Sequence, residues 1–378
     1  MMCSIIPPYI LRRLASLDDP AFASAAQAAR ASLLVDRPFR SIREGEAAPP
    51  TAPPGSPRQP GAQGRTTAIA RPLADPIRSV SDAGGSEELP GRLVRSDENP
   101  TGDADDAAVV EAWDGLGHTH ALFRDEYSRA SIDDDNLPLE ATVHFGRLYD
   151  NAFWNGERMV FGDGDGQVFT RMTASLSVIG HELAHGVTQY TAGLEYAGQS
   201  GALNESVSDV FGALVEQRTA NQSVTEATWL IGVGLFTDDV EGEAIRSMKA
   251  PGTAYDDDIL GKDPQPAHMD DYIETDDDNG GVHLNSGIPN RAFYLTAEAL
   301  GGYAWNAPGQ IWYDTLTSGT LSATVDFAGF AESTTDAATQ RFGADSAETA
   351  AVIAAWRTVG VTKDAPTARV TPGPADLG

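Results

Sequence analysis

His181-Glu182-Leu183-Ala184-His185 places two imidazole side chains four residues apart, with a carboxylate next to the first of them. In a helix, residues at positions i and i+4 project from the same face, so both ring nitrogens can reach one metal ion. Two histidines at this spacing, with an adjacent glutamate, are typical of the zinc-binding helix of a metallopeptidase. The stretch therefore predicts that His181 and His185 bind zinc and that Glu182 lies beside the metal without binding it.

A solvent-facing helix with two incidental histidines is the alternative interpretation, and the surrounding residues argue against it. Apolar residues recur every three or four positions through this segment, which predicts a helix over residues 172–190 with one continuous apolar stripe. The side that carries the histidines also carries Ala174, Val178 and Ala184. We therefore expect a helix that is buried nearly all round. Two buried imidazoles need partners, and a metal ion suits this spacing best.

A third zinc ligand is expected elsewhere, because a catalytic zinc ion usually has three protein ligands and one water. The best candidate lies in a second predicted helix over residues 203–218, on whose polar side Glu205 and Asp209 lie one turn apart. Glu205 can complete the ligand set, and Asp209 can accept the second ring N–H of a ligating histidine. An acidic pair by itself is more often a solvated face, so this assignment depends on the histidine motif. Gly212 and Ala213 would let two helices pack closely.

Four segments occur in a characteristic order along the chain. They are residues 151–156 (Asn-Ala-Phe-Trp-Asn-Gly), 181–185, 201–209 (Gly-Ala-Leu-Asn-Glu-Ser-Val-Ser-Asp) and 278–287 (Asp-Asn-Gly-Gly-Val-His-Leu-Asn-Ser-Gly). Together they resemble the thermolysin-like neutral zinc metallopeptidase family, a gluzincin family, and in particular its short-prosegment, protealysin-like branch. The resemblance extends over about residues 88–361.

The resemblance implies a zinc-dependent endopeptidase in which Glu182 acts as the general base on a zinc-bound water. It also implies that His181, His185 and Glu205 hold the zinc, that Tyr196 and His283 donate to the oxyanion, that Asp278 orients His283, and that Asn151, Ala152 and Arg246 bind substrate. A phenol O–H and a protonated imidazole suit the negative charge that builds on the carbonyl oxygen. Without the resemblance, a loop histidine with no function would be the preferred interpretation of His283, and Arg246 is equally compatible with a structural salt bridge.

Other functions remain open at this stage. A zinc-binding protein that has lost catalysis would keep the same metal ligands. A zinc hydrolase that acts on a different amide or ester would keep the base as well. The resemblance favours cleavage of internal peptide bonds, with bulky apolar residues just after the cut.

The expected fold is α+β with two lobes. A strand-rich N-terminal lobe over residues 66–190 includes the zinc-binding helix, and a mainly helical C-terminal lobe covers residues 191–361. Zinc would lie on the floor of the cleft between them. We expect strands at 141–145 and 158–161 with a tight turn between strands at 162–166, and helices at 21–34, 107–127, 172–190, 203–218, 225–235, 286–300, 307–317, 327–342 and 346–359.

The two ends of the chain differ in composition from the predicted lobes. Residues 1–45 have no recognisable secretion signal and resemble a short prosegment, with Pro7-Pro8 near its start; we expect it to act as an inhibitor. Residues 46–65 have a linker composition in which we expect a proteolytic cut, and residues 362–378 are expected to form a disordered tail. Cys3 is interpreted as a free thiol in preference to a zinc ligand of the inactive precursor.

Calcium is a second metal to consider, because many members of the family bind it next to the zinc-binding helix. The position one turn before His181 is Ser177, the segment 229–233 lacks acidic residues, and only Glu216 remains. A hard cation needs several oxygen ligands, so we predict that the double calcium site is absent. The acidic runs at 256–258 and 276–278 leave other calcium sites open, although solvated loops are the preferred interpretation.

Acidic residues dominate the overall charge, which is -29 for 378 residues. Such a charge disfavours binding to nucleic acid and to anionic membranes. The single cysteine excludes an internal disulfide, and no run approaches eighteen consecutive apolar residues, so no membrane span is expected. We expect a monomer that acts on proteins or peptides. The resemblance implies secretion, with cytoplasmic retention or non-classical export as the alternative.

Overall fold

The computed structural model of the chain describes residues 3–41 and 73–362. A six-stranded mixed sheet has the strand order β1-β5-β6-β4-β2-β3. β2 pairs with β4 and β4 with β6 in parallel, whereas the remaining neighbours are antiparallel. The strands are β1 (Cys3–Ser4), β2 (Arg78–Asp82), β3 (Arg92–Ser96), β4 (Leu139–Val143), β5 (Ala152–Trp154) and β6 (Met159–Phe161).

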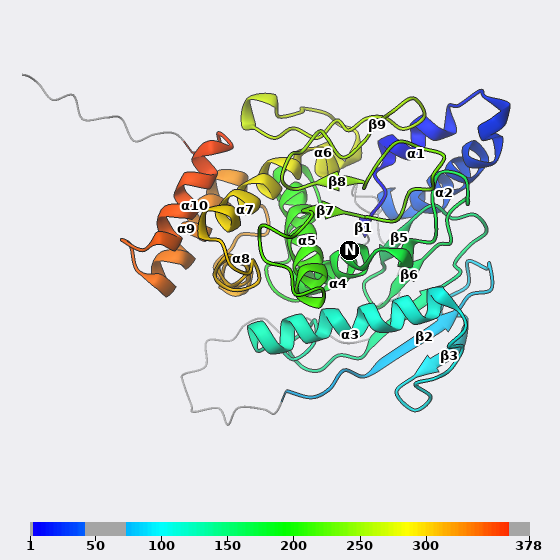
Figure 1. The fold of residues 1–378 in the computed structure, drawn as a ribbon, viewed down its shortest axis with the longest axis horizontal. Coiled ribbons are helices and arrows are strands. Elements are labelled where there is room, and N and C mark those ends of the chain that lie inside the picture. Colours follow the sequence, from blue (N-terminus) through cyan, green and yellow to red (C-terminus); the bar gives the residue numbers. More distant parts are fainter. Residues whose placement is uncertain (1–2, 42–72, 363–378) are drawn as a thin grey trace, which may run out of the picture.

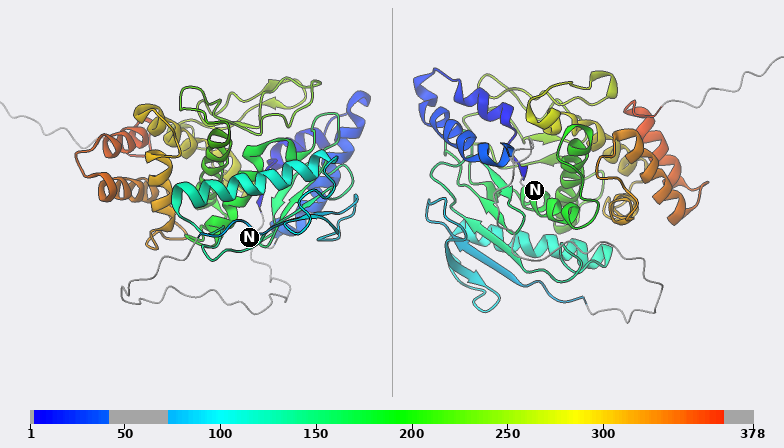
Figure 2. Two further views of the ribbon diagram at one scale, coloured as in Figure 1. Left: turned by 60° about the horizontal axis from the view of Figure 1, so that its bottom comes forward. Right: turned by 180° about the vertical axis from the view of Figure 1, so that it is seen from behind.

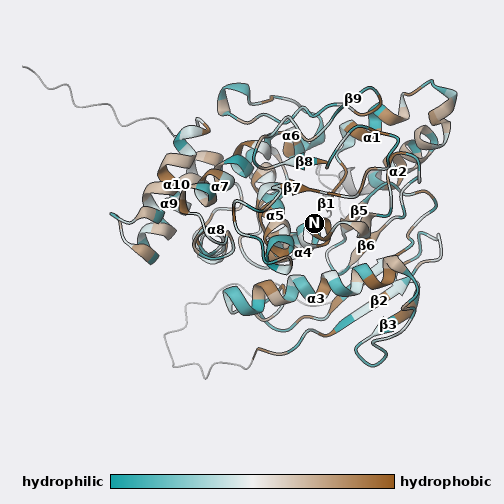
Figure 3. Ribbon diagram, in the orientation of Figure 1, coloured by the Kyte–Doolittle hydropathy of each residue, from teal (hydrophilic) through white to brown (hydrophobic). Residues whose placement is uncertain are grey.

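Helices make up most of the remaining structure. The long helix α3 (Ala107–Tyr127) packs on the sheet, and its hydrophilic and hydrophobic residues alternate along its length (Figure 3). The other helices are α1 (Pro8–Ala15), α2 (Ala23–Ser41), α4 (Leu176–Gln189), α5 (Gly198–Thr219), α6 (Asp278–Asn285), α7 (Gly287–Leu300), α8 (Ala307–Thr317), α9 (Phe327–Phe342) and α10 (Ala347–Thr358). Among the described residues, no helix is both long enough and apolar enough to cross a bilayer.

The helices α4 and α5 lie at the centre of the molecule, between the sheet with α3 on one side and the C-terminal helices on the other (Figure 1). Every residue of α4 from Ser177 to Thr188 is buried, as the apolar pattern predicted. Two glycines allow the close packing of these helices. A Cβ on Gly212 would lie 2.4 Å from the carbonyl oxygen of Ser177, and one on Gly180 would lie 3.0 Å from the Cα of Gly212. The expected α+β fold with a strand-rich lobe and a helical lobe is confirmed.

The N-terminal segment extends the sheet. β1 adds to the free edge of β5, with Cys3 opposite Trp154 and Ser4 opposite Phe153. The chain then turns into α1 and α2, which pack against each other. Figures 1 and 2 show that these two helices lie at the opposite end of the molecule from α9 and α10. β1 itself contacts the central helix α4, so residues at the start of the described chain reach the centre of the molecule.

Two predicted elements are wrong. The segment at 225–235 is not a helix: Leu230–Ile231 forms β7, which pairs with β8 (Arg246–Ser247). Trp229, Gly232 and Gly234 have φ of 59°, 83° and 85°, and these left-handed conformations end any helix. The segment at 162–166 does not connect two strands. β6 ends just before it, and the segment after it forms only an isolated bridge between Phe169 and Phe236. A further short pair joins β9 (Asp256–Asp257) and β10 (Gly261–Lys262).

The predicted domain boundaries remain predictions. The described residues exclude the whole of the proposed linker at 46–65 and all but the first residue of the proposed tail at 362–378. The same holds for the side chain of Cys3, so its proposed alternatives are unchanged.

Candidate active site

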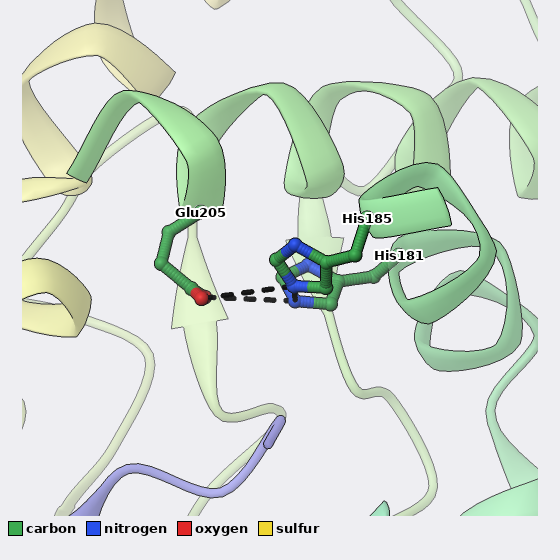
Figure 4. A group of neighbouring side chains, drawn as sticks. All are labelled: His181, His185 and Glu205. Atoms are coloured by element: carbon green, nitrogen blue, oxygen red, sulfur yellow. Dashed lines mark hydrogen bonds and ion pairs between the residues drawn. The ribbon is translucent and has the colours of Figure 1, made fainter. Parts of the chain in front are cut away.

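Three side chains predicted as zinc ligands converge between α4 and α5 (Figure 4). His181 and Glu205 are 0% exposed and His185 is 1% exposed. The two histidine Nε2 atoms are 3.0 Å apart. The carboxylate oxygens of Glu205 lie 3.5 Å from Nε2 of His181 and 3.6 Å from Nε2 of His185. One donor atom from each residue thus faces a common point.

The chemistry of these three groups fits a zinc ion. Burial and the neighbouring His181 lower the pKa of His185 to about 3, which keeps its imidazole neutral. Burial raises the pKa of Glu205, but His283, His181 and His185 outweigh that effect and lower the pKa to about 2. Two imidazole nitrogens and one carboxylate oxygen form the ligand set of a catalytic zinc site, in which the fourth position stays open.

A second group of side chains fixes the orientation of the histidines. Nδ1 of His181 lies 2.8 Å from Oδ1 of Asp209, the residue predicted for this role. Nδ1 of His185 lies 2.8 Å from Oδ1 of Asn204 and 3.0 Å from Oγ of Ser208. The amide of Asn204 donates to the carbonyl oxygen of Leu194, so its oxygen faces the ring of His185. Both histidines therefore direct Nε2 toward the metal position.

Asn204 is a functional residue that was not predicted from the sequence. Its position next to Glu205 and one turn before Ser208 is the only signal that the sequence contains. A neutral amide has no charge pattern that would distinguish it from an ordinary helix residue, so the tertiary contact with His185 is what reveals its role.

Asp209 also makes an ion pair with Arg246, and both side chains are 0% exposed. Burial raises the pKa of Asp209, but Arg246 and His181 outweigh it and hold the pKa well below its usual range. The amide of Asn290 donates to the same carboxylate at 2.8 Å. The structural salt bridge considered for Arg246 therefore exists. It uses Nε and Nη2 of the guanidinium, so Nη1 can bind another group.

The predicted oxyanion donors lie beside the zinc ligands. Nδ1 of His283 is 2.7 Å from Oδ1 of Asp278, and the backbone N–H of His283 donates to the other oxygen of that carboxylate. The hydroxyl of Tyr196 donates to Glu205 and lies 3.3 Å from Nε2 of His283. Burial lowers the pKa of His283, but Asp278 and Glu205 outweigh it and raise the pKa. A protonated His283 can donate to a developing oxyanion.

A distortion in α6 produces this arrangement. Asp278 and Asn279 have φ of 55° and 52°, and Gly280 and Gly281 have φ of 85° and 74°. Glycine adopts such backbone angles at little cost. The first turn is therefore not α-helical, and it brings the Asp278 carboxylate back toward both the backbone and the ring of His283.

Glu182 is held by the edge strand. Its Oε2 accepts a hydrogen bond of 2.8 Å from the backbone N–H of Trp154 in β5, and the residue is 0% exposed. The carboxylate thus lies between α4 and β5, next to the ligand histidines. A buried carboxylate beside this donor set could act as a general base.

The three residues predicted to bind substrate hold the N-terminal segment of the chain itself. The backbone N–H of Ile5 donates to the carbonyl oxygen of Ala152, and Nη1 of Arg246 donates to the carbonyl oxygen of Ile5. The side-chain amide of Asn151 accepts from the N–H of Ile6 at 2.9 Å and donates to its carbonyl oxygen at 3.3 Å. The structure thus brings every predicted site residue into one region.

The positions considered for calcium are engaged in other contacts. Oγ of Ser177 lies 3.0 Å from Oγ of Ser175 and accepts from the backbone N–H of Gly232. Burial raises the pKa of Glu216, although hydrogen bonds from Ser177 act in the opposite direction. A raised pKa makes Glu216 a weaker candidate for a calcium ligand, because the metal binds the ionised carboxylate. The absence of the double calcium site remains a prediction.

Comparisons with known proteins identify the family. A model of the thermolysin metallopeptidase catalytic domain matches residues 68–189, and a model of the thermolysin metallopeptidase alpha-helical domain matches residues 192–361. This chain belongs to the thermolysin family of metallopeptidases. Its place in this family confirms the predicted resemblance and shows that the protein is a peptidase.

Two curated relatives illustrate the similarity. An extracellular metalloprotease of Pectobacterium carotovorum subsp. carotovorum is 47% identical over 95% of this chain and 96% of its own length. Protease PrtS of Photorhabdus sp. (strain Az29) is 49% identical over 75% of this chain and 76% of its own length.

A solved structure is similar to this chain over nearly its whole length. The precursor of protealysin, a metalloproteinase from Serratia proteamaculans, superposes with a TM-score of 0.81 at 48% sequence identity. The match covers 95% of this chain and 100% of that one. The protealysin-like branch expected from the sequence is thereby confirmed.

Proposed function

We propose that this chain is the precursor of a zinc-dependent endopeptidase whose catalytic base is Glu182. The convergence of His181, His185 and Glu205 next to Glu182 carries the proposal. A zinc ion held by these three ligands would polarise a peptide carbonyl and make a water molecule more acidic. The family requires such a metal, and the buried donor set fits it.

The remaining steps belong to side chains of the protein. Glu182 takes a proton from the attacking water and delivers it to the leaving amine. Tyr196 and His283 donate to the oxyanion, while Asp278 keeps the imidazole of His283 protonated and oriented. Arg246 and Asn151 bind backbone groups of the substrate, as they bind those of the N-terminal segment in the precursor.

Residues 1–45 act as an inhibitory prosegment in this proposal. The support is that Ile5 and Ile6 form hydrogen bonds with the groups proposed to bind substrate. Contacts further along α2 anchor the segment to the loop that precedes β5. Oγ of Ser32 accepts from the backbone N–H of Asp150, and Asp36 accepts from Tyr149. A cut in the linker at 46–65 would release it from the lobes at 66–190 and 191–361, leaving the tail at 362–378 in place.

The proposed substrates are proteins and peptides, and the enzyme is proposed to act as a secreted monomer. The support for secretion is that similar members of the family are called extracellular. N-terminal sequencing of the active enzyme locates the cut in the chain. Retention of Met1 or Met2 in fully active enzyme would contradict the prosegment proposal.

The decisive experiment incubates processed protein with casein and an internally quenched peptide, with and without a chelator. We expect cleavage of both substrates, loss of cleavage with the chelator and recovery with zinc. Glu182→Gln is expected to keep stoichiometric zinc by metal analysis and to lose at least the 10²–10⁴-fold typical of general acid–base catalysis. Glu332→Gln on the exposed face of α9 is the matched control and should remain active. Unchanged cleavage by Glu182→Gln would refute the mechanism.

A further inference from the structure

The N-terminal segment meets the site through a continuous series of backbone contacts. β1 pairs antiparallel with β5, so Cys3 and Ser4 lie opposite Trp154 and Phe153. Beyond the strand, the N–H of Ile5 donates to the carbonyl oxygen of Ala152 at 3.1 Å. An extended peptide that adds to a strand edge in this way has a fixed register.

The carbonyl groups of consecutive residues point to different partners. The carbonyl oxygen of Ile5 accepts from Nη1 of Arg246 at 3.1 Å, and that of Ile6 accepts from Nδ2 of Asn151 at 3.3 Å. The carbonyl oxygen of Ser4 instead lies 3.0 Å from Nε2 of His283. Of these three carbonyls, the Ser4 carbonyl alone faces the histidine that we propose as an oxyanion donor.

The groups around this carbonyl are those of the proposed reaction centre. Nε2 of His283 is 3.4 Å from Oε2 of Glu205, the carboxylate of the metal-ligand cluster. Trp154, the partner of Cys3 in the strand pair, donates its backbone N–H to Glu182. One proposed oxyanion donor therefore contacts the carbonyl group of the peptide bond that joins Ser4 to Ile5, and that donor lies next to a proposed metal ligand. The proposed base is bonded to the strand residue that faces Cys3.

We propose that the Ser4–Ile5 bond is the first substrate of the precursor and is hydrolysed within the same molecule. This inference rests on the proposed function and adds a specific cleavage site to it. A water oxygen bonds to the carbonyl carbon of Ser4, the bond from that carbon to the nitrogen of Ile5 breaks, and Glu182 transfers the proton of the water to that nitrogen. The products are a Met1–Ser4 peptide with a Ser4 carboxylate and a chain that begins with the Ile5 amine.

The remaining prosegment stays bound after this cleavage. Ile5, Ile6, Leu11 and Leu14 are 0% exposed and belong to the core. Arg13 donates to the backbone carbonyl oxygens of Asp258 and Ile259, at 2.8 Å in each case. The contacts of Ile5 and Ile6 with Ala152, Arg246 and Asn151 also lie on the retained side of the bond. Hydrolysis at Ser4 therefore leaves the substrate-binding groups covered, and the precursor remains latent until the linker is cut.

The test follows the intact mass of the full-length precursor, purified with a chelator and then loaded with zinc. We expect loss of Met1–Ser4 at a first-order rate that does not change on dilution, because the cut is intramolecular. Glu182→Gln should keep its full length. Ile5→Leu, which conserves side-chain volume, should be cut at the same bond, whereas Ile5→Asp, which puts a charge at a fully buried position, should lose the cut.

Amide hydrogen exchange tests the register of the N-terminal segment on β5 without any catalytic turnover. In the metal-free full-length protein, amide hydrogen exchange should be slow at Ile5 and Ile6, and Asn151→Ala should accelerate exchange at Ile6 selectively. Fast exchange at both amides would overturn the register.

The outcomes of the mass experiment separate the two proposals. An intact N-terminus in the zinc-loaded precursor, with normal casein cleavage by the processed enzyme, overturns the Ser4–Ile5 cleavage alone. Cleavage at another bond before Pro7 overturns it in the same way. Failure of the processed enzyme to cleave casein overturns the proposed function on which the inference rests.

Discussion

Asp209 and Arg246 form a two-point ion pair that is completely shielded from solvent. Nε of Arg246 donates to Oδ2 of Asp209 at 2.8 Å, and Nη2 donates to Oδ1 at 2.7 Å. The same carboxylate contacts Nδ1 of His181, and the third nitrogen of Arg246 holds the carbonyl oxygen of Ile5. One carboxylate thus connects the metal-ligand cluster with the groups that hold a bound peptide.

The first prediction concerns Asp209→Asn. The amide nitrogen would face the guanidinium or the imidazole N–H, so at least one buried donor loses its acceptor. We expect a loss of about 3–5 kcal/mol in the free energy of unfolding and a loss of about 10–100-fold in zinc affinity. Urea unfolding of the metal-free protein and competition with a zinc chelator measure the two effects.

Asp314→Asn is the matched control for this prediction. Asp314 pairs with Arg341 in α9, and their side chains are 25% and 43% exposed. Exposed ion pairs contribute little to stability, so zinc affinity and unfolding should stay close to those of the parent. A zinc affinity of Asp209→Asn equal to that of the control would show that Asp209 does not orient His181.

Much of the central site could be predicted from the sequence because its key residues come in pairs that are close together in the chain. The two histidines are one helical turn apart in α4, and Glu205 and Asp209 are one turn apart in α5. Each pair therefore shares a face once the helix forms. The close packing of the two helices brings the pairs together, and Gly212 already signalled that packing.

The parts that were missed or wrong depend on distant contacts. β1 has two residues, and its register comes from β5, about 150 positions later in the chain. The apolar run from Trp229 to Val233 suggested a helix, yet its burial comes from a short strand pair, with Ile231 0% exposed. Local periodicity cannot distinguish a buried turn and strand from a short buried helix.

The second prediction concerns Tyr196 and His283, the two proposed oxyanion donors. Tyr196→Phe and His283→Ala each remove one hydrogen-bond donor. Nε2 of His283 contacts the carbonyl oxygen of Ser4, and the hydroxyl of Tyr196 lies next to that nitrogen. Each substitution should reduce kcat by about 10²–10³-fold, with a much smaller change in KM, because the lost hydrogen bond forms mainly in the transition state. Steady-state kinetics of the processed enzyme on a quenched peptide measure both constants. Tyr190→Phe, at a position that is 44% exposed, is the control. Loss confined to KM would assign these residues to ground-state binding instead.

The third prediction concerns latency. Asp36 is 2% exposed and accepts hydrogen bonds from the hydroxyl of Tyr149 at 2.5 Å and from the amide of Asn151 at 3.0 Å. Asp36→Ala would leave both buried donors without this acceptor, at a cost of about 1–3 kcal/mol for each donor. Inhibition of the processed enzyme by the isolated prosegment should weaken roughly thirtyfold or more.

Arg12→Ala is the control for the latency prediction. Arg12 pairs with Asp277, and the two side chains are 45% and 71% exposed, so screening by solvent leaves little to lose. Equal inhibition constants for the Asp36 and Arg12 variants would show that the buried contact does not hold the prosegment.

The fourth prediction tests the contact between α4 and α5. A methyl group on Gly212 would meet the backbone of Ser177, which cannot move independently of the zinc-binding helix. Gly212→Ala should therefore destabilise the protein by about 1–3 kcal/mol and reduce zinc affinity. Gly117→Ala in α3 is the control, because its methyl group would meet only the flexible guanidinium of Arg78. Wild-type stability of Gly212→Ala would show that the two helices can separate at little cost.

The fifth prediction concerns pH and a buried acid beneath α2. Burial and the adjacent Asp165 carboxyl raise the pKa of Asp150 to about 9, and Asp150 is 0% exposed. An aspartate in the unfolded chain loses its proton near pH 3.8. Between these two values the folded state holds a proton that the unfolded state has lost, so stability falls as pH rises.

Asp150→Asn keeps the shape of the side chain and cannot ionise. Its unfolding free energy should therefore fall less than that of the parent between pH 5 and pH 9, as measured by urea unfolding across this range, while Asp345→Asn at an exposed position should follow the parent. Parallel curves for the parent and Asp150→Asn would mean that Asp150 does not titrate upon unfolding in this range.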